Sequence, residues 1–413
     1  MVQVSLCISS MSSVWSLWCL CDGCVVIISD ILYIDSISIL LIWSLAWLGV
    51  SVTVVPCSGT TLYIIISLLI SALFYSSPNW IGFFLWFEFS MLPMFVLIMS
   101  HSVSPERLSA AQFLFMYTIM GSIPLLIYIL EMKGMNSSSS IWLSVNSWKS
   151  SSSLWSVLAW SSFMVKLPLF LVHLWLLKAH VEAPMLGSMF LAGVLLKFGG
   201  LGVVRLMSVA YQSDWIYPIM MGVSMVGSAS SAILALTSTD IKMVVAYASV
   251  SHMNLGLVWG LLGTFQSMSS FMLSMVAHSF SSSLLFYSAT RSYEETGSRN
   301  TVLLKGVLAH SMLGYFAGIV VWGMNLNIPP FLGLWGEVVG FLAVVKLIPF
   351  MIITLLIYFA YSSCYSMIMF IIQFHMKSNL PYPPSLTLEY CIQHLACSLP
   401  LFIGFVTVWS LEI

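Results

Sequence analysis

Charge is what this sequence has least of. Only 7% of its 413 residues are Asp, Glu, Lys or Arg, against about 25% in a typical soluble domain. Hydrophobic residues make up 60% of the chain, and the mean hydropathy is +1.02. Polar side chains are therefore too few to cover a folded domain in water. A soluble protein is therefore excluded. The net charge of −1 also shows no excess of basic residues that could bind nucleic acid, so a nucleic-acid-binding protein is excluded as well.

The sequence also lacks the motifs of nucleotide binding and electron transfer. It contains no G-x-G-x-x-G after a strand, no P-loop and no cysteine array for an iron–sulfur cluster. Cys21-x-x-Cys24 has a spacing found in metal and redox sites, but no second pair follows it. We expect the cysteines to pack as small apolar residues, and we expect no cofactor or metal in this chain.

A cleavable signal and an Arg-rich transit sequence are not recognisable at the N-terminus. We therefore expect the chain to be inserted by the translation machinery of the membrane's own compartment.

Long apolar runs dominate what is present. A hydrocarbon core of about 30 Å takes about 20 helical residues to cross, whereas barrel strands would alternate in segments of about 10 residues. The runs do not alternate, and they predict an all-α, polytopic membrane helix bundle with about a dozen crossings. The expected spans are 4–29, 37–56, 60–76, 80–100, 108–130, 154–178, 186–210, 215–237, 243–263, 266–289, 302–345, 348–374 and 392–411.

One of these spans is expected to be broken in its middle. Asn325, Asn327, Pro329, Pro330 and Gly333 interrupt the apolar stretch 302–345. Backbone irregularity at membrane depth is tolerated where protein or a water-filled cavity surrounds it. We expect all the spans to form a single transmembrane domain over residues 1–413, with N-terminal spans in 1–79, a core in 80–345 and C-terminal spans in 346–413.

Six ionisable residues lie away from the expected span ends, on separate helices. A charged residue at the centre of a membrane helix costs roughly 3 kcal/mol on insertion scales, and such residues usually line ion or proton paths. Because a tight turn joins their spans, Lys166 and Lys197 can lie at similar depth on antiparallel neighbours. Glu88 is the candidate partner of Lys166. The six candidate relay residues are Glu88, Lys166, Lys197, His252, His278 and Glu337.

Structural roles stay open for the same residues. The lysines and glutamates could form ion pairs that only hold helices together, and each histidine could be a hydrogen-bonded packing residue. Lys346 is expected to snorkel toward the interface from a span end. A solvated or loop-clamping role at a membrane face is expected for Lys178, His180, Glu182 and Asp240.

The motifs around these residues resemble one family. KLPLFLVHLWLLKAHVEAPMLGSMFLAGVLLKFGGLGVVR, with FEFSMLPM, PER and TDIKMVVAYASVSHM, resembles chain 4 of NADH:ubiquinone oxidoreductase, respiratory complex I, over about residues 80–345. The resemblance implies an antiporter-like proton-channel core over 80–345 with two broken helices. It also implies that NADH, FMN, iron–sulfur clusters and ubiquinone are bound by other subunits, with membrane-arm subunits and the lipid bilayer as neighbours.

The resemblance also implies roles by position. Glu88 and Lys166 look like the family's paired acid and lysine, the latter on a broken helix. Lys197 looks like the central lysine, and Glu337 like the terminal acid on the second broken helix. The histidines of the intervening helices match His252 and His278.

Two departures accompany the resemblance. The family usually has more helices, and the shortage lies before Glu88; Ser279 stands where a glycine usually follows the histidine. A reduced chain of this kind indicates an animal mitochondrial genome and the mitochondrial inner membrane. A cation/proton antiporter subunit and a structural scaffold remain the competing interpretations.

Overall fold

The structure is a computed structural model that describes residues 26–29, 32–54, 59–102, 105–135, 153–207, 216–306, 312–329 and 331–375. The expected span 392–411, and all of the expected span 4–29 except its last residues, lie outside this part of the chain. The chain divides into two compact units. One comprises Met1–Leu167 and Val194–Tyr217, and the other comprises Pro168–Gly193 and Pro218–Ile413.

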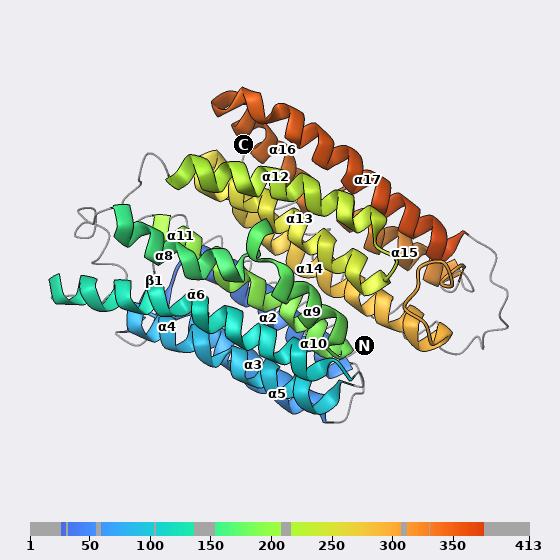
Figure 1. Ribbon diagram of the computed structural model, residues 1–413, viewed down its shortest axis with the longest axis horizontal. Helices are drawn as coiled ribbons and strands as arrows, with labels where there is room; N and C mark the ends of the chain where they lie inside the picture. The colour runs from blue at the N-terminus through green and yellow to red at the C-terminus, as the bar shows by residue number, and fades with distance from the viewer. Residues whose placement is uncertain are drawn as a thin grey trace. The chain divides into compact units, whose positions relative to one another are not determined.

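The first unit is a layer of helices preceded by a small antiparallel hairpin in which Val26 faces Ile34 and Ile27 faces Tyr33. Helix α6 packs on α5 and α8, α3 packs on α2, α4 and α5, and α8 packs on α11 (Figure 1). Its elements are β1 (Val26–Ser29), β2 (Leu32–Ile34), α2 (Ser36–Val54), α3 (Thr60–Tyr75), α4 (Trp80–Phe89), α5 (Met91–His101), α6 (Arg107–Met135), α8 (Ser153–Lys166) and α11 (Leu196–Met207).

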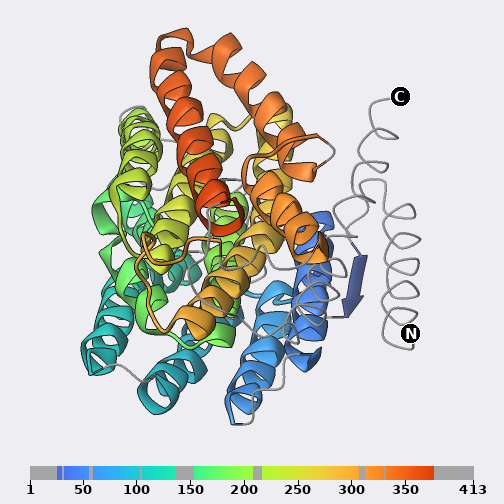
Figure 2. The same cartoon turned by 90° about the vertical axis from the view of Figure 1, so that its right-hand side faces the viewer.

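The second unit is built on α14, which packs against α10, α13, α15 and α16. Figures 1 and 2 show α13 and α14, both in yellow tones, running alongside each other. Helix α17 packs on α15. The elements are η1 (Phe170–Val172), α9 (Leu174–Glu182), α10 (Met185–Phe190), α12 (Ile216–Thr237), α13 (Ile241–Leu262), α14 (Phe265–Thr296), α15 (Met312–Asn325), α16 (Leu332–Leu347), η3 (Pro349–Met351) and α17 (Ile352–Phe374).

Six helical segments in the described residues are long and apolar enough to cross a membrane. Their bounds lie close to the expected spans, which confirms the all-α membrane-bundle class. They are Trp80–His101, Arg107–Glu131, Met185–Met207, Ile216–Thr237, Ile241–Leu262 and Pro349–Phe374. Helix α14 is 32 residues long, about 48 Å at 1.5 Å per residue, so its charged last turns extend past the expected span 266–289.

Two helices are broken, as the sequence predicts. The chain leaves α8 at Lys166 because Pro168 has no backbone N–H and pushes Leu167 away from the helical conformation. The break between α15 and α16 follows from Asn327, whose φ of 52° lies in the left-handed region that Asn tolerates better than most residues. In each case the break falls close to a candidate relay residue, Lys166 or Glu337.

A third irregularity was not predicted. Residues Leu191–Leu195, labelled η2, wind as a π-helix between α10 and α11. Such wide turns are rare in proteins overall, but those that occur are often found at functional sites. This one ends two residues before Lys197.

Candidate functional site

Lys166 and Lys197 lie on two closely packed helices of the first unit, α8 and α11. The glycines of α11 make this approach possible: Gly199 packs on the backbone of Leu167, and Gly202 packs on the ring of Phe163. Lys166 and Lys197 are 1% and 0% exposed. The sequence allows these two lysines to lie at similar depth on antiparallel neighbours, and in the structure α8 packs on α11.

The ammonium of Lys166 has an unexpected acceptor. Its Nζ donates to the backbone carbonyl oxygen of Phe87 at 2.7 Å and lies 3.1 Å from the centroid of the Phe87 ring. Glu88, the next residue, is close enough to interact electrostatically with Lys166. Its buried Oε1 has no hydrogen-bond partner among the described residues. The predicted acid–base pair is therefore adjacent but not directly bonded.

Aromatic rings surround this lysine. Phe74 stacks on Phe198 with ring centroids 4.0 Å apart, and Phe83, Phe87 and Phe163 complete the cluster at 4.4–6.3 Å. Such rings exclude water and lower the local dielectric, which strengthens any interaction between the charges they enclose.

Arg205, two turns beyond Lys197 on α11, is a structural anchor of the same unit. Its guanidinium lies 3.6 Å from the Asp35 carboxylate and donates to the backbone oxygens of Tyr75 at 3.2 Å and Ser77 at 3.5 Å. It thereby ties the start of α2 and the turn between α3 and α4 to α11.

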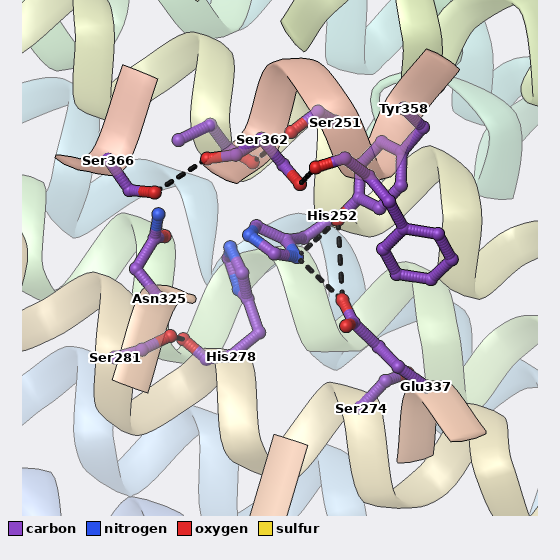
Figure 3. A network of polar contacts seen from close by, with 12 residues as sticks. Ser251, His252, Ser274, His278, Ser281, Asn325, Glu337, Tyr358, Ser362 and Ser366 are labelled. Atoms are coloured by element: carbon purple, nitrogen blue, oxygen red, sulfur yellow. Dashed lines mark hydrogen bonds and ion pairs between the residues drawn. The ribbon is translucent and has the colours of Figure 1, made fainter. Parts of the chain in front are cut away.

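In the second unit, three side chains from three helices converge. His252 on α13, Glu337 on α16 and Tyr358 on α17 point toward one another (Figure 3). The Tyr358 hydroxyl is 2.8 Å from Nδ1 of His252 and 3.4 Å from Oε1 of Glu337, and these last two atoms are 3.7 Å apart. A carboxylate and an imidazole this close can exchange a proton through a group that bridges them.

A small cavity adjoins this cluster. Its volume is about 20 Å³, and its lining includes His252, His278, Asn327 and Glu337. A cavity of this size has room for about one water molecule. The rings of His252 and His278 are 6.0 Å apart between centroids. A water in the cavity would lie within reach of the imidazoles and the carboxylate that line it.

Asn254 bonds to the backbone just beyond the end of α8. Its Nδ2 donates to the carbonyl oxygen of Pro168 at 2.9 Å and to that of Val250 at 2.8 Å. The carbonyl at the break would otherwise lack a helical partner, so Asn254 fixes the chain at Pro168, where the second unit begins.

The charged residues near the ends of these helices clamp loops. Nζ of Lys242 donates to the carbonyl oxygen of Ala183 at 3.0 Å, and Glu182 pairs with Arg299 at 3.6 Å. His180 is buried, with its ring stacked on Phe286 at 4.4 Å. Asp240 forms an isolated bridge with Asn300. Lys178 and Lys346 are exposed.

The structure brings the six candidates together as two sets of three. Glu88, Lys166 and Lys197 belong to the first unit, and His252, His278 and Glu337 belong to the second. Within the described residues, no group of three or more His, Cys, Asp or Glu is placed to hold a metal ion.

Tyr358 and Asn254 were missed by the sequence analysis. The only available signal was weak. Tyr358 and Tyr365 are seven residues apart and so share one face of a helix. Asn254 is an amide in an otherwise apolar span.

The chain is similar in sequence to a family whose model is described as "NADH:quinone oxidoreductase/Mrp antiporter, TM", which matches residues 77–359. NADH-ubiquinone oxidoreductase chain 4 of Lumbricus terrestris is 34% identical over 333 residues, covering 78% of this chain and 73% of the relative. The protein of the same name from Aedes aegypti is 36% identical over 308 residues, covering 71% and 66%. The one from Myxine glutinosa is 33% identical over 336 residues, covering 77% and 70%.

Solved structures share the fold. A chain of respiratory complex I from Thermus thermophilus with bound NADH has a TM-score of 0.80 at 20% identity, covering 91% of this chain and 82% of that one. A chain of the Mrp complex from Dietzia sp. has a TM-score of 0.85 at 15% identity, covering 99% and 90%.

Proposed function

The chain belongs to the NADH-ubiquinone oxidoreductase chain 4 family, and on this premise we propose that it moves protons through two sets of buried titratable side chains. It is an antiporter-like, proton-translocating subunit of NADH:ubiquinone oxidoreductase. It is a multi-pass protein of the mitochondrial inner membrane, in contact with lipid and other membrane-arm subunits. The redox groups of the reaction, NADH, FMN, iron–sulfur clusters and ubiquinone, are bound by other subunits in this proposal.

The burial of Lys166 and Lys197 is the observation that carries the proposed relay. Both are 1% exposed or less, and they lie on adjacent helices in an apolar span. A chain with so few charges has little need of two lysines there for stability, since a buried charge costs several kcal/mol unless it is well paired. A lysine that gains and loses a proton as its surroundings change would explain their presence.

In the first unit, Glu88 and Lys166 act as the switch. Lys166 bonds to the Phe87 carbonyl in this structure, and Oε1 of Glu88 has no hydrogen-bond partner among the described residues. A shift of the ammonium toward Glu88 would favour the charged forms of both groups. Lys197, on the neighbouring helix α11, is the next proton carrier.

In the second unit, His252, His278 and Glu337 form the other half of the relay. The cavity beside them has room for one water molecule, which would contact His278 as well as the cluster. Glu337 follows the break between α15 and α16 and is the last carboxylate of this set.

The test uses the assembled respiratory complex in sealed inner-membrane vesicles. The chain should co-purify with flavin- and iron–sulfur-containing proteins; purification without them, with cation/proton exchange activity, would favour an antiporter subunit instead. In the complex, Lys197→Met should lower the number of protons translocated per electron. Lys178→Met, which removes an exposed lysine of α9, should not. An unchanged ratio in Lys197→Met would favour a scaffold.

A further inference from the structure

Tyr358 is a buried residue whose hydroxyl has two titratable neighbours. The side chain is 0% exposed. A buried tyrosine hydroxyl ordinarily finds one hydrogen-bond partner, and a backbone carbonyl would be sufficient. This hydroxyl instead lies 2.8 Å from Nδ1 of His252 and 3.4 Å from Oε1 of Glu337. Its place between an imidazole and a carboxylate needs a reason beyond packing.

The distances in this triangle show why a bridge is needed. Nδ1 of His252 and Oε1 of Glu337 are 3.7 Å apart, which exceeds the range of about 2.7–3.2 Å for an N–H···O hydrogen bond. A proton therefore has no short hydrogen-bonded path along that edge. The two hydrogen-bonded edges meet at the oxygen of Tyr358 (Figure 3). The edge to His252 is short, whereas the edge to Glu337, at 3.4 Å, exceeds the usual O–H···O distance of about 2.5–3.0 Å and has to shorten for transfer.

We propose that the Tyr358 hydroxyl carries the proton between His252 and Glu337, as a relay residue that no motif in the sequence marks. A hydroxyl has one hydrogen to donate and two lone pairs that accept. It can therefore accept from Nδ1–H on one side and donate to Oε1 on the other. This inference rests on the proposed proton relay, and it names the group that joins two of its members.

The transfer balances without ionising the phenol. The Nδ1–H bond of the His252 imidazolium breaks as a bond forms to the Tyr358 oxygen. In the same event the hydrogen already on that oxygen moves to Oε1 of Glu337. His252 ends neutral, Glu337 ends protonated, and Tyr358 remains a neutral phenol. Rotation of the hydroxyl about its C–O bond then restores the starting arrangement.

The packing of the ring keeps the hydroxyl in place. The rings of Tyr358 and His252 meet edge to face, with centroids 6.0 Å apart and an interplanar angle of 86°. Phe359 packs against the same tyrosine at 5.2 Å. Removing only the hydroxyl should therefore leave both ring contacts intact.

Tyr365 provides a matched control on the same helix. It is also buried, at 1% exposed, and its hydroxyl accepts a hydrogen bond from Nδ2 of Asn325 at 3.2 Å. Asn325 is a neutral amide, so this hydroxyl does not bridge a titratable pair as Tyr358 does. Tyr365→Phe and Tyr358→Phe thus make the same chemical change, each removing one bonded, buried hydroxyl from α17.

The experiment measures proton translocation coupled to NADH oxidation in sealed vesicles holding the intact complex. Tyr358→Phe should slow translocation by about tenfold or more and change its solvent deuterium isotope effect. Tyr365→Phe should alter neither. Parental rates and isotope effect in Tyr358→Phe would overturn the proposal. An equal loss in both variants would also overturn it, because the cause would then be structural.

Two variants of Glu337 separate this inference from the proposed function. If Glu337→Gln abolishes translocation while Tyr358→Phe does not, the relay stands and the tyrosine bridge fails. If neither variant has an effect, both fail. Should Tyr358→Phe not assemble, Glu337→Asp decides: it withdraws the carboxylate from the hydroxyl by one methylene and should slow translocation, whereas a parental rate would contradict the bridge.

Discussion

Lys166 donates a hydrogen bond to the carbonyl oxygen of Phe87. The nearby carboxylate, which would attract the positive charge of Lys166 more strongly, belongs to Glu88, the residue after Phe87. The ammonium is thus held one residue away from its acid partner. A small movement along α4 would replace a neutral acceptor by a charged one, and charge-assisted hydrogen bonds are roughly twice as strong as neutral ones. We therefore expect Lys166 to have two alternative acceptors, the carbonyl oxygen of Phe87 and the carboxylate of Glu88.

Replacing Glu88 by Gln should remove the charged acceptor. Glu88→Gln keeps the shape of the side chain but cannot accept a proton, so we expect translocation coupled to NADH oxidation to slow by about tenfold or more. Assembly should be retained, because Glu88 is only half-buried and, within the part of the chain that the structure describes, its Oε1 makes no hydrogen bond. The measurement is proton uptake per NADH oxidised. Glu106→Gln, on an exposed carboxyl at the start of α6, is the control, and unimpaired pumping in Glu88→Gln would remove the switch.

Gly202 sets the distance between the helices of the two lysines. A Cβ added there would collide with the ring of Phe163. We expect Gly202→Ala to lower the free energy of unfolding by about 1–3 kcal/mol, as overpacking does, and to slow translocation because α8 and α11 move apart. Thermal unfolding of the purified complex and the pumping rate measure the two effects.

Gly222 on α12 is the matched control, since a Cβ there meets nothing within 4 Å. Gly222→Ala should be neutral or should stabilise by up to about 1 kcal/mol through helix propensity. Equal behaviour of the two alanine variants would show that the close approach at Gly202 is unimportant.

Arg205 should matter for stability rather than for transport. Arg205→Met leaves the Asp35 carboxylate and the carbonyl oxygens of Tyr75 and Ser77 without their shared donor. Breaking a buried pair by removing one partner costs about 3–5 kcal/mol, so the variant should unfold at lower temperature. Arg107→Met, on an exposed arginine, should change the free energy of unfolding by less than about 0.5 kcal/mol. A stable Arg205→Met chain would contradict the anchoring role.

Glu295 predicts a pH dependence at the end of α14, beyond the expected span. Burial raises its pKa from 4.5 to about 7, with Arg291 opposing the rise and Glu294 adding to it. Between pH 4.5 and about 7, Glu295 is therefore mostly protonated in the folded segment and mostly ionised in the unfolded segment. The folded form binds more protons in this window, so the local stability falls as pH rises through it.

The size of this effect is limited, because Glu295 is about half-buried and solvent screens it. We expect at most about 1 kcal/mol. Amide hydrogen exchange of the last two turns of α14, corrected for the intrinsic pH dependence of exchange, measures it. Glu295→Gln should remove the slope between pH 4.5 and 7; a slope that persists in that variant would have another origin.

The helices and their breaks could be predicted from the sequence because each has a local cause. Apolar runs long enough for a bilayer gave α6, α12 and α13 within a few residues. The break in 302–345 has a local cause in the backbone conformation of Asn327, whereas the break after Lys166 was expected from the family resemblance and has its local cause in Pro168. The end of α14 was placed too early, because its charged last turns read as a loop. The helix in fact ends at Gly297, in the left-handed conformation that terminates many helices.

The contacts of the site could not be predicted in the same way, because they depend on side-chain direction across helices. Nothing local to Lys166 indicates that its ammonium meets a backbone carbonyl rather than Glu88. Tyr358 has two other tyrosines within seven residues, Tyr361 and Tyr365, and only the packing of α17 distinguishes them. The roles of the six candidate residues stay predictions until the variants are measured.

The wide π turn at Leu191–Leu195 has a bearing on how this chain can vary. Each residue in an α-helix advances the winding by about 100°, so one residue more or fewer swings everything downstream to another side. If the same five residues wound as a regular α-helix, Lys197 and Arg205 would turn together by about 100°, even though neither codon changed. A deletion of one residue inside this turn should therefore be tolerated better than a deletion elsewhere between Met185 and Lys197, because it removes the surplus residue and keeps the register.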